Sequence, residues 1–237
     1  MEKISRVPDV FQRRSATFLL WLFLGALLAA GLGIVVFERY IAEKRSTKTD
    51  SESLIVRSIT ESDHVIGEIS APVQVVVYAD LSCPYCKRFF ESTLPRLQAV
   101  YGDTIVVAFR HLPLAQHKRS RLEANAAECI ASLEGNDAFW RYVRKIYEQP
   151  DYEQGLAIPK LVSLADGDGE SRAHMTTCIE SGEHDARVRT DMLEAAVAGM
   201  SVTPSIVLKS ATRALIVKGD YYSQLDTGIE YLLGDSI

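Results

Sequence analysis

The sequence predicts an α/β fold in which a helical domain is inserted into a small β-sheet, preceded by one N-terminal transmembrane helix. Three observations support this prediction. Short runs rich in β-branched apolar residues occur at 72–78 and 104–109, and two further strand patterns occur near the C-terminus. The stretch between these two pairs of strands has helical periodicity. Residues 18–36 form an apolar run without a single charge.

The composition fits a protein with a substantial core. The chain has 237 residues, 47% of them hydrophobic, and a formal net charge of −5. We expect no nucleic-acid partner, because no basic face dominates the sequence to neutralise phosphates. The four cysteines fit either two disulfides in an oxidising compartment or four thiols in a reducing one, so their number alone does not decide the compartment.

The apolar run at 18–36 is long enough to cross a bilayer, since about 20 helical residues span the hydrocarbon core. A cleaved signal peptide is an alternative, because small residues at 29–31 resemble a cleavage site. A buried core helix is a third interpretation, although core helices of this length usually have a polar face. Four Lys and Arg residues precede the run and four follow it closely. Because the two numbers are equal, the distribution of positive charge does not indicate which end of the run faces the cytoplasm.

The surrounding segments predict the domain organisation. We expect a cytoplasmic tail over 1–14, a transmembrane anchor over 15–37, and a solvated stalk over 38–62 that is rich in charged and hydroxyl residues. The folded domain should extend over 63–237, with its helical insertion at about 117–200.

The folded domain begins with a β-α-β unit. Residues 72–78 (PVQVVVY) have the pattern of a strand buried on both faces, and residues 104–109 (TIVVAF) form a second strand. Apolar residues at helical spacing predict a helix over 86–100 between them, and Pro95 should kink this helix.

The second half of the sheet follows the helical insertion. A long helix is predicted over about 183–198, strands over 205–208 and 215–217, and a closing helix over 222–233. The order β-α-β, helical insertion, β-β-α is that of a thioredoxin fold with a helical domain between its halves.

The motif Cys83-Pro84-Tyr85-Cys86 lies where the first strand passes into the helix. Pro84 suits the first helical position, which places Cys83 at the N-cap, where the helix dipole stabilises a thiolate. Cys86 lies one helical turn further on. We predict that Cys83 is the nucleophile and Cys86 the resolving thiol of a redox pair.

A zinc site and an inert structural bridge are the alternatives for this motif. We expect no metal, because the sequence has no second Cys-x-x-Cys to complete a zinc site.

Two further features are predicted to adjoin the cysteines. Asp80 ends the strand three residues before Cys83, and it either passes a proton to or from Cys86 or is a solvated carboxylate. Thr203 and Pro204 lead into a later strand. In a thioredoxin fold a cis-proline loop faces the Cys-x-x-Cys, and the residue before the proline offers its backbone to an extended substrate.

From about residue 63 to the C-terminus the chain resembles the DsbA-like family of extracytoplasmic thiol oxidoreductases. The resemblance lies in APVQVVVYADLSCPYCKRFF, FRHLPLAQH, AAECI, FWRYVRKIY, MTTCIESGEH and AGMSVTPSIVL, which occur in family order. It implies a thioredoxin fold with a helical insert, a redox pair at Cys83 and Cys86, and a loop of Thr203 and Pro204 beside them.

The sequence departs from the strongly oxidising members of this family at Tyr85, where they carry a histidine that helps to hold the thiolate. A weaker oxidant or a reductant is therefore an alternative. Cys-Pro-Tyr-Cys and a threonine before the proline also resemble the disulfide isomerase branch of the family. Residues 38–62 are too short for the N-terminal dimerisation domain of that branch.

The second pair of cysteines, Cys129 and Cys178, lies on two predicted helices of the insertion. A disulfide between them would close a loop of about 50 residues and contribute up to roughly 4 kcal/mol in the chain-entropy model. Two buried free thiols or an auxiliary redox pair are the alternatives.

These features together predict a protein-disulfide oxidoreductase that forms or exchanges disulfides in exported proteins without a cofactor. We expect a membrane redox partner that regenerates the cysteine pair, and a catalytic domain on the periplasmic side of the cytoplasmic membrane. An isomerase or reductase of the same fold, and a tethered module that binds a soft metal such as Cu(I), are the alternatives.

Overall fold

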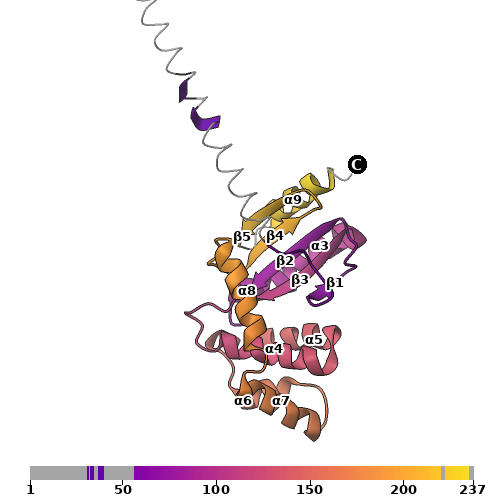
Figure 1. Ribbon diagram of the computed structural model, residues 1–237, viewed down its shortest axis with the longest axis vertical. Helices are drawn as coiled ribbons and strands as arrows, with labels where there is room; N and C mark the ends of the chain where they lie inside the picture. The colour runs from indigo at the N-terminus through magenta and orange to yellow at the C-terminus, as the bar shows by residue number, and fades with distance from the viewer. Residues whose placement is uncertain (1–30, 32, 35–36, 40–55, 220–221, 235–237) are drawn as a thin grey trace, which may run out of the picture. The chain divides into compact units, whose positions relative to one another are not determined.

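Figure 1 shows the computed structural model, which describes residues 31, 33–34, 37–39, 56–219 and 222–234. The chain divides into two units, residues 1–48 and 49–237. The predicted tail, most of the predicted anchor and residues 40–55 of the stalk lie outside the described residues, so these predictions stay untested. No helix within the described part of the chain has the length and apolar character needed to span a bilayer.

The second unit is built on a mixed sheet of five strands in the order β1-β3-β2-β4-β5. Strands β2 and β3 are parallel, and the other neighbouring pairs are antiparallel. The central position of β2 explains its apolar sequence, because both of its faces are covered. The strands are β1 (His64–Ile66), β2 (Val73–Ala79), β3 (Ile105–His111), β4 (Ser205–Lys209) and β5 (Ala214–Lys218).

Four of these strands match the predicted ones, whereas β1 was not predicted. It has three residues and pairs with β3 at one edge of the sheet. Three residues are too few to show the alternation by which a strand is recognised in a sequence.

The helix after β2 is irregular, as Pro95 predicts. An α-helical turn, α2 (Pro84–Arg88), is followed by a π-helical turn over Phe89–Thr93 and then by α3 (Leu94–Tyr101). In the π-helical turn the N–H of Leu94 donates to the carbonyl of Phe89, five residues back. Turns of this kind are a known source of helix kinks.

Five helices form the insertion, and a sixth closes the chain. Figure 1 shows α4 to α7 gathered at one end of the sheet, while α8 leads back towards the strands and contacts β3. Helix α9 contacts β2, β4 and β5. The bounds are α4 (Ser120–Glu134), α5 (Asn136–Tyr147), α6 (Ile158–Leu164), α7 (Gly169–Ser181), α8 (Asp185–Val197) and α9 (Tyr222–Gly234).

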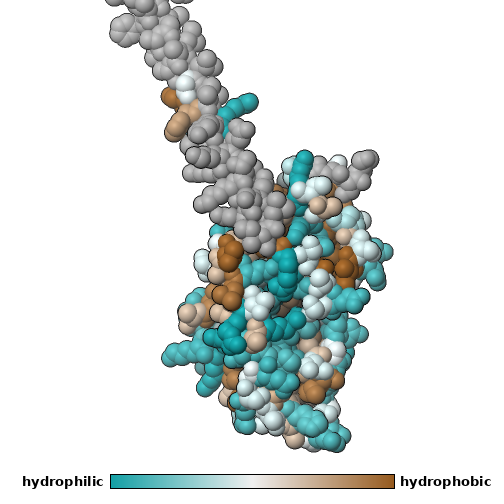
Figure 2. Space-filling view, viewed as in Figure 1, coloured by the Kyte–Doolittle hydropathy of each residue, from teal (hydrophilic) through white to brown (hydrophobic). Residues whose placement is uncertain are grey.

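The sheet separates two apolar cores. Successive side chains of β2 point to opposite faces, so Val75 and Val77 enter one core while Val76 and Tyr78 enter the other. The first core contains the α2–α3 segment, α9 and most of the helical insertion. The second core lies under the C-terminal end of α8. Figure 2 shows apolar side chains on the outer surface of α8, where Leu193 and Val197 are exposed.

The predicted stalk over 38–62 extends too far. Val56 and Ile59 are buried in the second core, with 0% and 4% of their surface exposed. The N–H of Ile59 donates to the side-chain oxygen of Gln74 on β2 at 3.0 Å. The folded domain therefore begins no later than Val56. The many charged and hydroxyl residues of 38–62 suggested a solvated segment, whereas two of its few apolar side chains fix its end to the sheet.

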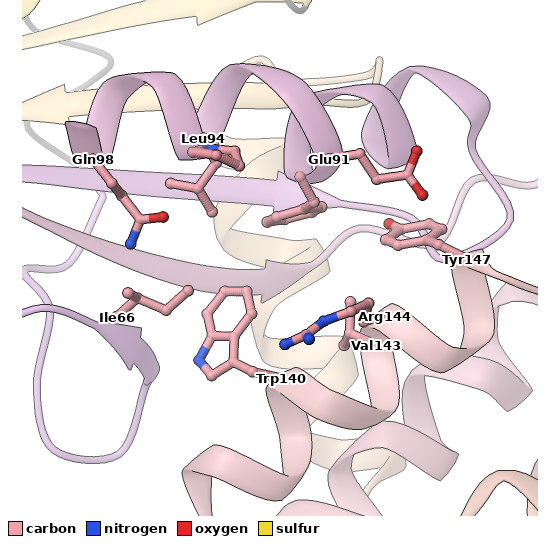
Figure 3. A pocket seen from close by; sticks show the side chains of 10 residues that line it. Ile66, Glu91, Leu94, Gln98, Trp140, Val143, Arg144 and Tyr147 are labelled. Carbon is pink, nitrogen blue, oxygen red and sulfur yellow. The ribbon is translucent and has the colours of Figure 1, made fainter. Parts of the chain in front are cut away.

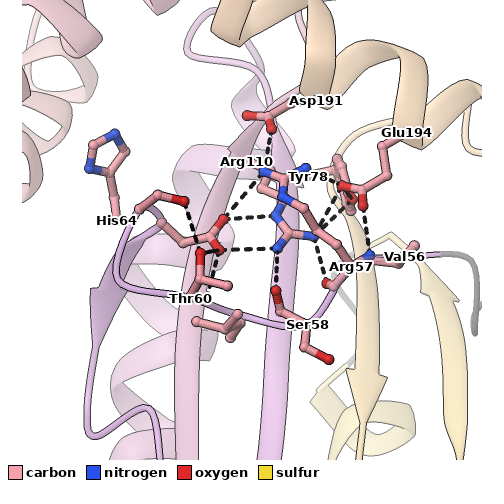
Figure 4. A network of polar contacts seen from close by, with 12 residues as sticks. Val56, Arg57, Ser58, Thr60, His64, Tyr78, Arg110, Asp191 and Glu194 are labelled. Carbon is pink, nitrogen blue, oxygen red and sulfur yellow. Dashed lines mark hydrogen bonds and ion pairs between the residues drawn. The ribbon is translucent and has the colours of Figure 1, made fainter.

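A buried polar network holds this segment in place (Figure 4). Arg110 on β3 is fully buried and pairs with Asp63 at 2.9 Å and with Glu194 on α8 at 3.0 Å. It also donates to the carbonyls of Arg57 and Ser58 at 3.0 and 3.3 Å. Burial alone would raise the pKa of Asp63, but the hydrogen bond and charge of Arg110 outweigh it and lower that pKa.

Replacing Arg110 with methionine should lower the free energy of unfolding by about 3–5 kcal/mol, because the buried Asp63 and the partly buried Glu194 would lose this cation. Urea denaturation followed by circular dichroism measures the change. Arg189→Met is the control, since Arg189 is exposed and lies 4.0 Å from Asp185; it should shift the free energy by about 0.5 kcal/mol at most. Equal losses in the two variants would contradict this account of the network.

Candidate active site

Cys83 lies at the junction of β2 and α2, as predicted. It is the N-cap residue, with φ −93° and ψ 122°, and Pro84 occupies the first turn. The N–H of Lys87 donates to the carbonyl of Cys83 at 3.1 Å and so closes the first helical turn. The sulfur of Cys83 therefore lies at the positive end of the helix, among backbone N–H groups without helical partners.

The pKa of Cys83 is lowered to about 6. A hydrogen bond from the Cys86 thiol is the largest cause, and burial of the sulfur opposes it. Contact with Thr203 and the backbone N–H groups of Tyr85 and Cys86 lower the pKa further. At neutral pH the Cys83 sulfur is thus mostly a thiolate, the form that attacks disulfides.

Cys86 has the opposite environment. Its side chain is fully buried, and burial, followed by the hydrogen bond to Cys83, raises the pKa of Cys86 well above its usual value. The N–H of Asp80 approaches its sulfur at 3.5 Å. Both thiols are free in this structure. The contrast between them favours the predicted roles, with Cys83 as nucleophile and Cys86 as resolving thiol.

The Thr203–Pro204 peptide bond is cis, as predicted from the fold. The Cys83 sulfur lies 3.5 Å from the carbonyl oxygen of Thr203, although the two residues are 120 positions apart. The loop before β4 therefore lies against the cysteine pair. Each of these two segments carries an exposed apolar side chain. Tyr85, between the two cysteines, is 57% exposed, and Val202, directly before Thr203, is 46% exposed.

Asp80 is not solvated, so that alternative is wrong. Only 1% of its surface is exposed, and its carboxylate accepts three hydrogen bonds. The donors are the N–H of Ser82 at 2.8 Å, the N–H of Leu114 at 2.7 Å and Nδ1 of His117 at 2.9 Å. A proton transfer between Asp80 and Cys86 stays a prediction.

Two functional neighbours were not predicted from the sequence. Glu123 on α4 is fully buried and accepts hydrogen bonds from Ser82 and from the N–H of Leu156. Tyr147 on α5 donates its hydroxyl to the carbonyl of Asp80 at 3.2 Å. Both lie on helices of the insertion, and their place beside the cysteines depends on how those helices pack. A glutamate within an alanine-rich helix was the only sequence signal for Glu123.

Tyr147 also lines a groove next to the active site (Figure 3). This groove has a volume of about 270 Å³ and lies between the Phe90–Gln98 stretch and α5. Trp140 and Phe90 form an edge-to-face pair inside it, and Arg144 lies on its α5 side. The groove is mostly apolar, and a cation and a glutamate lie among its lining residues.

Cys129 and Cys178 form a disulfide between α4 and α7, as predicted, with their Cα atoms 6.0 Å apart. His184 lies close to both sulfurs, and this is the one cluster of metal-ligating side chains among the described residues. Its sulfurs are joined to each other, so they are not available as thiolate ligands. The disulfide leaves Cys83 and Cys86 as the free thiols of the chain.

A family model described as thioredoxin matches residues 59–220. Two solved structures cover most of the chain at 25% identity and a TM-score of 0.62. One is Pseudomonas aeruginosa DsbA2, with 74% of this chain and 97% of that chain covered. The other is oxidised BdbD from Bacillus subtilis, with 73% and 93% covered. The predicted resemblance to DsbA-like proteins and the predicted thioredoxin fold with a helical insertion are confirmed.

Two curated relatives match this chain over only part of their own length. Disulfide bond formation protein D of Bacillus subtilis is 39% identical over 100 residues, which are 41% of this chain and 45% of that protein. A protein of Mycolicibacterium gilvum named Na(+)/H(+) antiporter NhaA 1 is 28% identical over 187 residues. That match covers 76% of this chain but only 28% of the relative. The chain thus spans less than half the length of these relatives.

The lowered pKa of Cys83 predicts its reactivity. In the reduced protein, alkylation of Cys83 by iodoacetamide should rise with pH around a midpoint of about 6, while Cys86 reacts only at much higher pH. Mass spectrometry of quenched samples measures the two rates separately. A Cys83 midpoint near that of a free cysteine, about 8.5, would contradict a stabilised thiolate.

Proposed function

Because the chain belongs to the thioredoxin family and, within it, resembles the DsbA-like thiol–disulfide oxidoreductases, we propose that it forms or exchanges disulfides in exported proteins. Cys83 and Cys86 are the redox pair. The observation that carries the proposal is the position of the Cys83 sulfur, at the N-terminus of α2 with a lowered pKa and 3.5 Å from the carbonyl of Thr203.

The reaction starts from the oxidised pair. A substrate thiolate attacks the Cys83 sulfur, the Cys83–Cys86 bond breaks, and Cys86 leaves with the electron pair and takes up a proton. A second substrate thiolate then attacks the substrate sulfur of the mixed disulfide and releases Cys83 as a thiolate. The substrate has lost two electrons and gained a disulfide, and the pair has been reduced. The low pKa of Cys83 makes it a good leaving group in the second step.

The cis-proline loop supplies the substrate contact. Thr203 lies beside Cys83, and an extended substrate segment passing the sulfur meets its backbone. Exposed Tyr85 and Val202 offer apolar surface at the same place, which suits unfolded segments with exposed apolar side chains.

The direction we propose is oxidation of the substrate. A stabilised thiolate at Cys83 stabilises the reduced pair and so makes the disulfide a better oxidant. Here the helix N-terminus and the Cys86 thiol supply this stabilisation, in the absence of a charged residue at position 85. Isomerisation or reduction by the same pair is the alternative.

The location we propose is the periplasmic side of the cytoplasmic membrane, with residues 15–37 as the anchor. The uncharged run at 18–36 supports the anchor, and the Cys129–Cys178 disulfide supports an oxidising compartment. A membrane redox partner would reoxidise Cys83 and Cys86 after each cycle.

Single serine variants test the division of roles. Cys83→Ser should abolish oxidation of a reduced, unfolded protein substrate, because without Cys83 the active-site disulfide that a substrate thiolate attacks cannot form. When the substrate instead carries a disulfide, Cys86→Ser should accumulate a mixed disulfide with it, because the Cys83 thiolate attacks the substrate disulfide and the resolving thiol that would release Cys83 is missing. Non-reducing electrophoresis detects this adduct, and the double variant is the control that should form none. Full activity of Cys83→Ser would refute the assignment.

The reduction potential tests the direction. We expect the Cys83–Cys86 pair to have a potential closer to about −120 mV than to about −270 mV, the values of a strong oxidant and of thioredoxin. Equilibration with glutathione buffers, followed by thiol trapping and mass spectrometry, measures it. A potential near that of thioredoxin would favour the reductase alternative.

A further inference from the structure

Glu123 is a buried carboxylate beside the redox pair that the reaction described above does not use. Its side chain projects from α4 with 0% of the residue's surface exposed. One carboxylate oxygen accepts a hydrogen bond from the Ser82 hydroxyl at 2.5 Å, and the other accepts one from the N–H of Leu156 at 2.8 Å. Ser82 is the residue immediately before Cys83, so Glu123 holds the turn that carries the nucleophile.

No cation forms an ion pair with Glu123 among the residues that the structure describes. Burial is the largest cause that raises the pKa of Glu123, to about 7, while the hydrogen bonds from Ser82 and Leu156 oppose it. A carboxyl group in this range gains or loses its proton near neutral pH.

The charged groups around Glu123 come from three sides. Asp80, on the active-site turn, raises the pKa of Glu123, and His117, on the loop before α4, lowers it. On the same loop, the guanidinium of Arg119 is held by the carbonyl of Gly155 at 2.9 Å. From α5, Tyr142 and Tyr147 lie near enough for the charge of Glu123 to raise their pKa, after the larger effect of burial, so both phenols stay neutral.

Glu123 and the two sulfurs share one buried polar region. After the larger effect of burial, the pKa of Tyr147 is raised by the charges of four groups: Cys86, Asp80, Cys83 and Glu123. Ser82 links Asp80 to Glu123, since its N–H donates to the Asp80 carboxylate and its hydroxyl donates to the Glu123 carboxylate. Charges are screened less inside a protein than in water, so we expect a negative charge at Cys83 and one at Glu123 to repel each other.

We propose that Glu123 is a positioning residue that takes up a proton when the Cys83–Cys86 disulfide is reduced. The inference rests on thiol–disulfide exchange at this pair and not on its direction or compartment. Two electrons from substrate thiols break the S–S bond, Cys86 takes one proton, and Cys83 remains a thiolate. The new charge at Cys83 favours the protonated form of Glu123, which takes a second proton from solvent. Oxidation of the pair releases both protons.

The pH dependence of the redox equilibrium tests this coupling. For a pair that takes up one proton per two electrons, the equilibrium constant of reduction changes tenfold per pH unit; each further proton adds up to another tenfold. Between about pH 6 and about pH 8 the equilibrium constant of reduction of the wild-type pair should therefore change by clearly more than tenfold per pH unit. In Glu123→Gln it should change by about tenfold per pH unit. Glu123→Gln should also favour the reduced pair at about pH 8 much more than at about pH 6.

Two further variants separate charge from hydrogen bonding. Ser82→Ala removes the hydrogen bond but leaves the carboxylate, so it should keep the steeper dependence and move its midpoint to higher pH. Glu134→Gln is the matched control, because Glu134 is an exposed glutamate at the end of the same helix; it should behave as wild type. Glutathione buffers corrected for their own pH dependence, with thiol trapping and mass spectrometry, give all four curves.

Equal pH dependence in wild type and Glu123→Gln would overturn the proposal, as would a Ser82→Ala curve identical to that of Glu123→Gln. Failure of the wild-type pair to equilibrate with glutathione would instead refute the exchange activity itself. If Glu123→Gln does not fold, infrared difference spectra of the wild type decide the question. Reduction near neutral pH should produce the band of a protonated carboxyl group, a band that Ser82→Ala retains, and its absence would contradict the coupling.

Discussion

The hydrogen bonds of Asp80 hold the active site together. Its carboxylate accepts the N–H groups of Ser82 and Leu114 and the ring of His117, and so joins the active-site turn to the loop that enters the helical insertion. Its backbone carbonyl accepts the N–H of Cys83 at 3.1 Å and the hydroxyl of Tyr147. Because one buried residue accepts from all of these groups, the end of β2, the start of α2 and the insertion keep a fixed arrangement.

The contrast between the two cysteines follows from this arrangement. The turn after β2 brings Cys83 to the N-terminus of α2, where backbone N–H groups stabilise a thiolate. One helical turn later Cys86 is fully buried, and burial disfavours its ionised form. The insertion is part of the same site, since α4 and α5 contribute Glu123 and Tyr147. It also carries the Cys129–Cys178 disulfide, which links α4 to α7.

The sequence predicts those parts of the fold that depend on local patterns. The apolar runs predicted four strands, and Pro95 predicted an irregular helix. The cysteine motif predicted that Cys83 is the N-cap residue of this helix. The cis bond before Pro204 followed from the fold, which the order of elements indicated. The contacts of Glu123 were not predicted, because Ser82 lies 41 positions away and helical periodicity does not report which helix packs on which turn. The packing of Val56 was missed because the apolar run at 54–56 is only three residues long, too short to show the periodicity of a strand or helix.

The network around Arg110 has a mechanical consequence for the domain. A pull on the chain at Val56 is borne by the bonds that residues 56–63 make. Lys209 of β4 holds the carbonyl of Val56, and Glu194 of α8 binds both the N–H and the guanidinium of Arg57. Such a pull is shared between the sheet and α8 through side chains remote in sequence from Cys83. A pull at this end of the domain is thus resisted by bonds that include neither Cys83 nor Cys86.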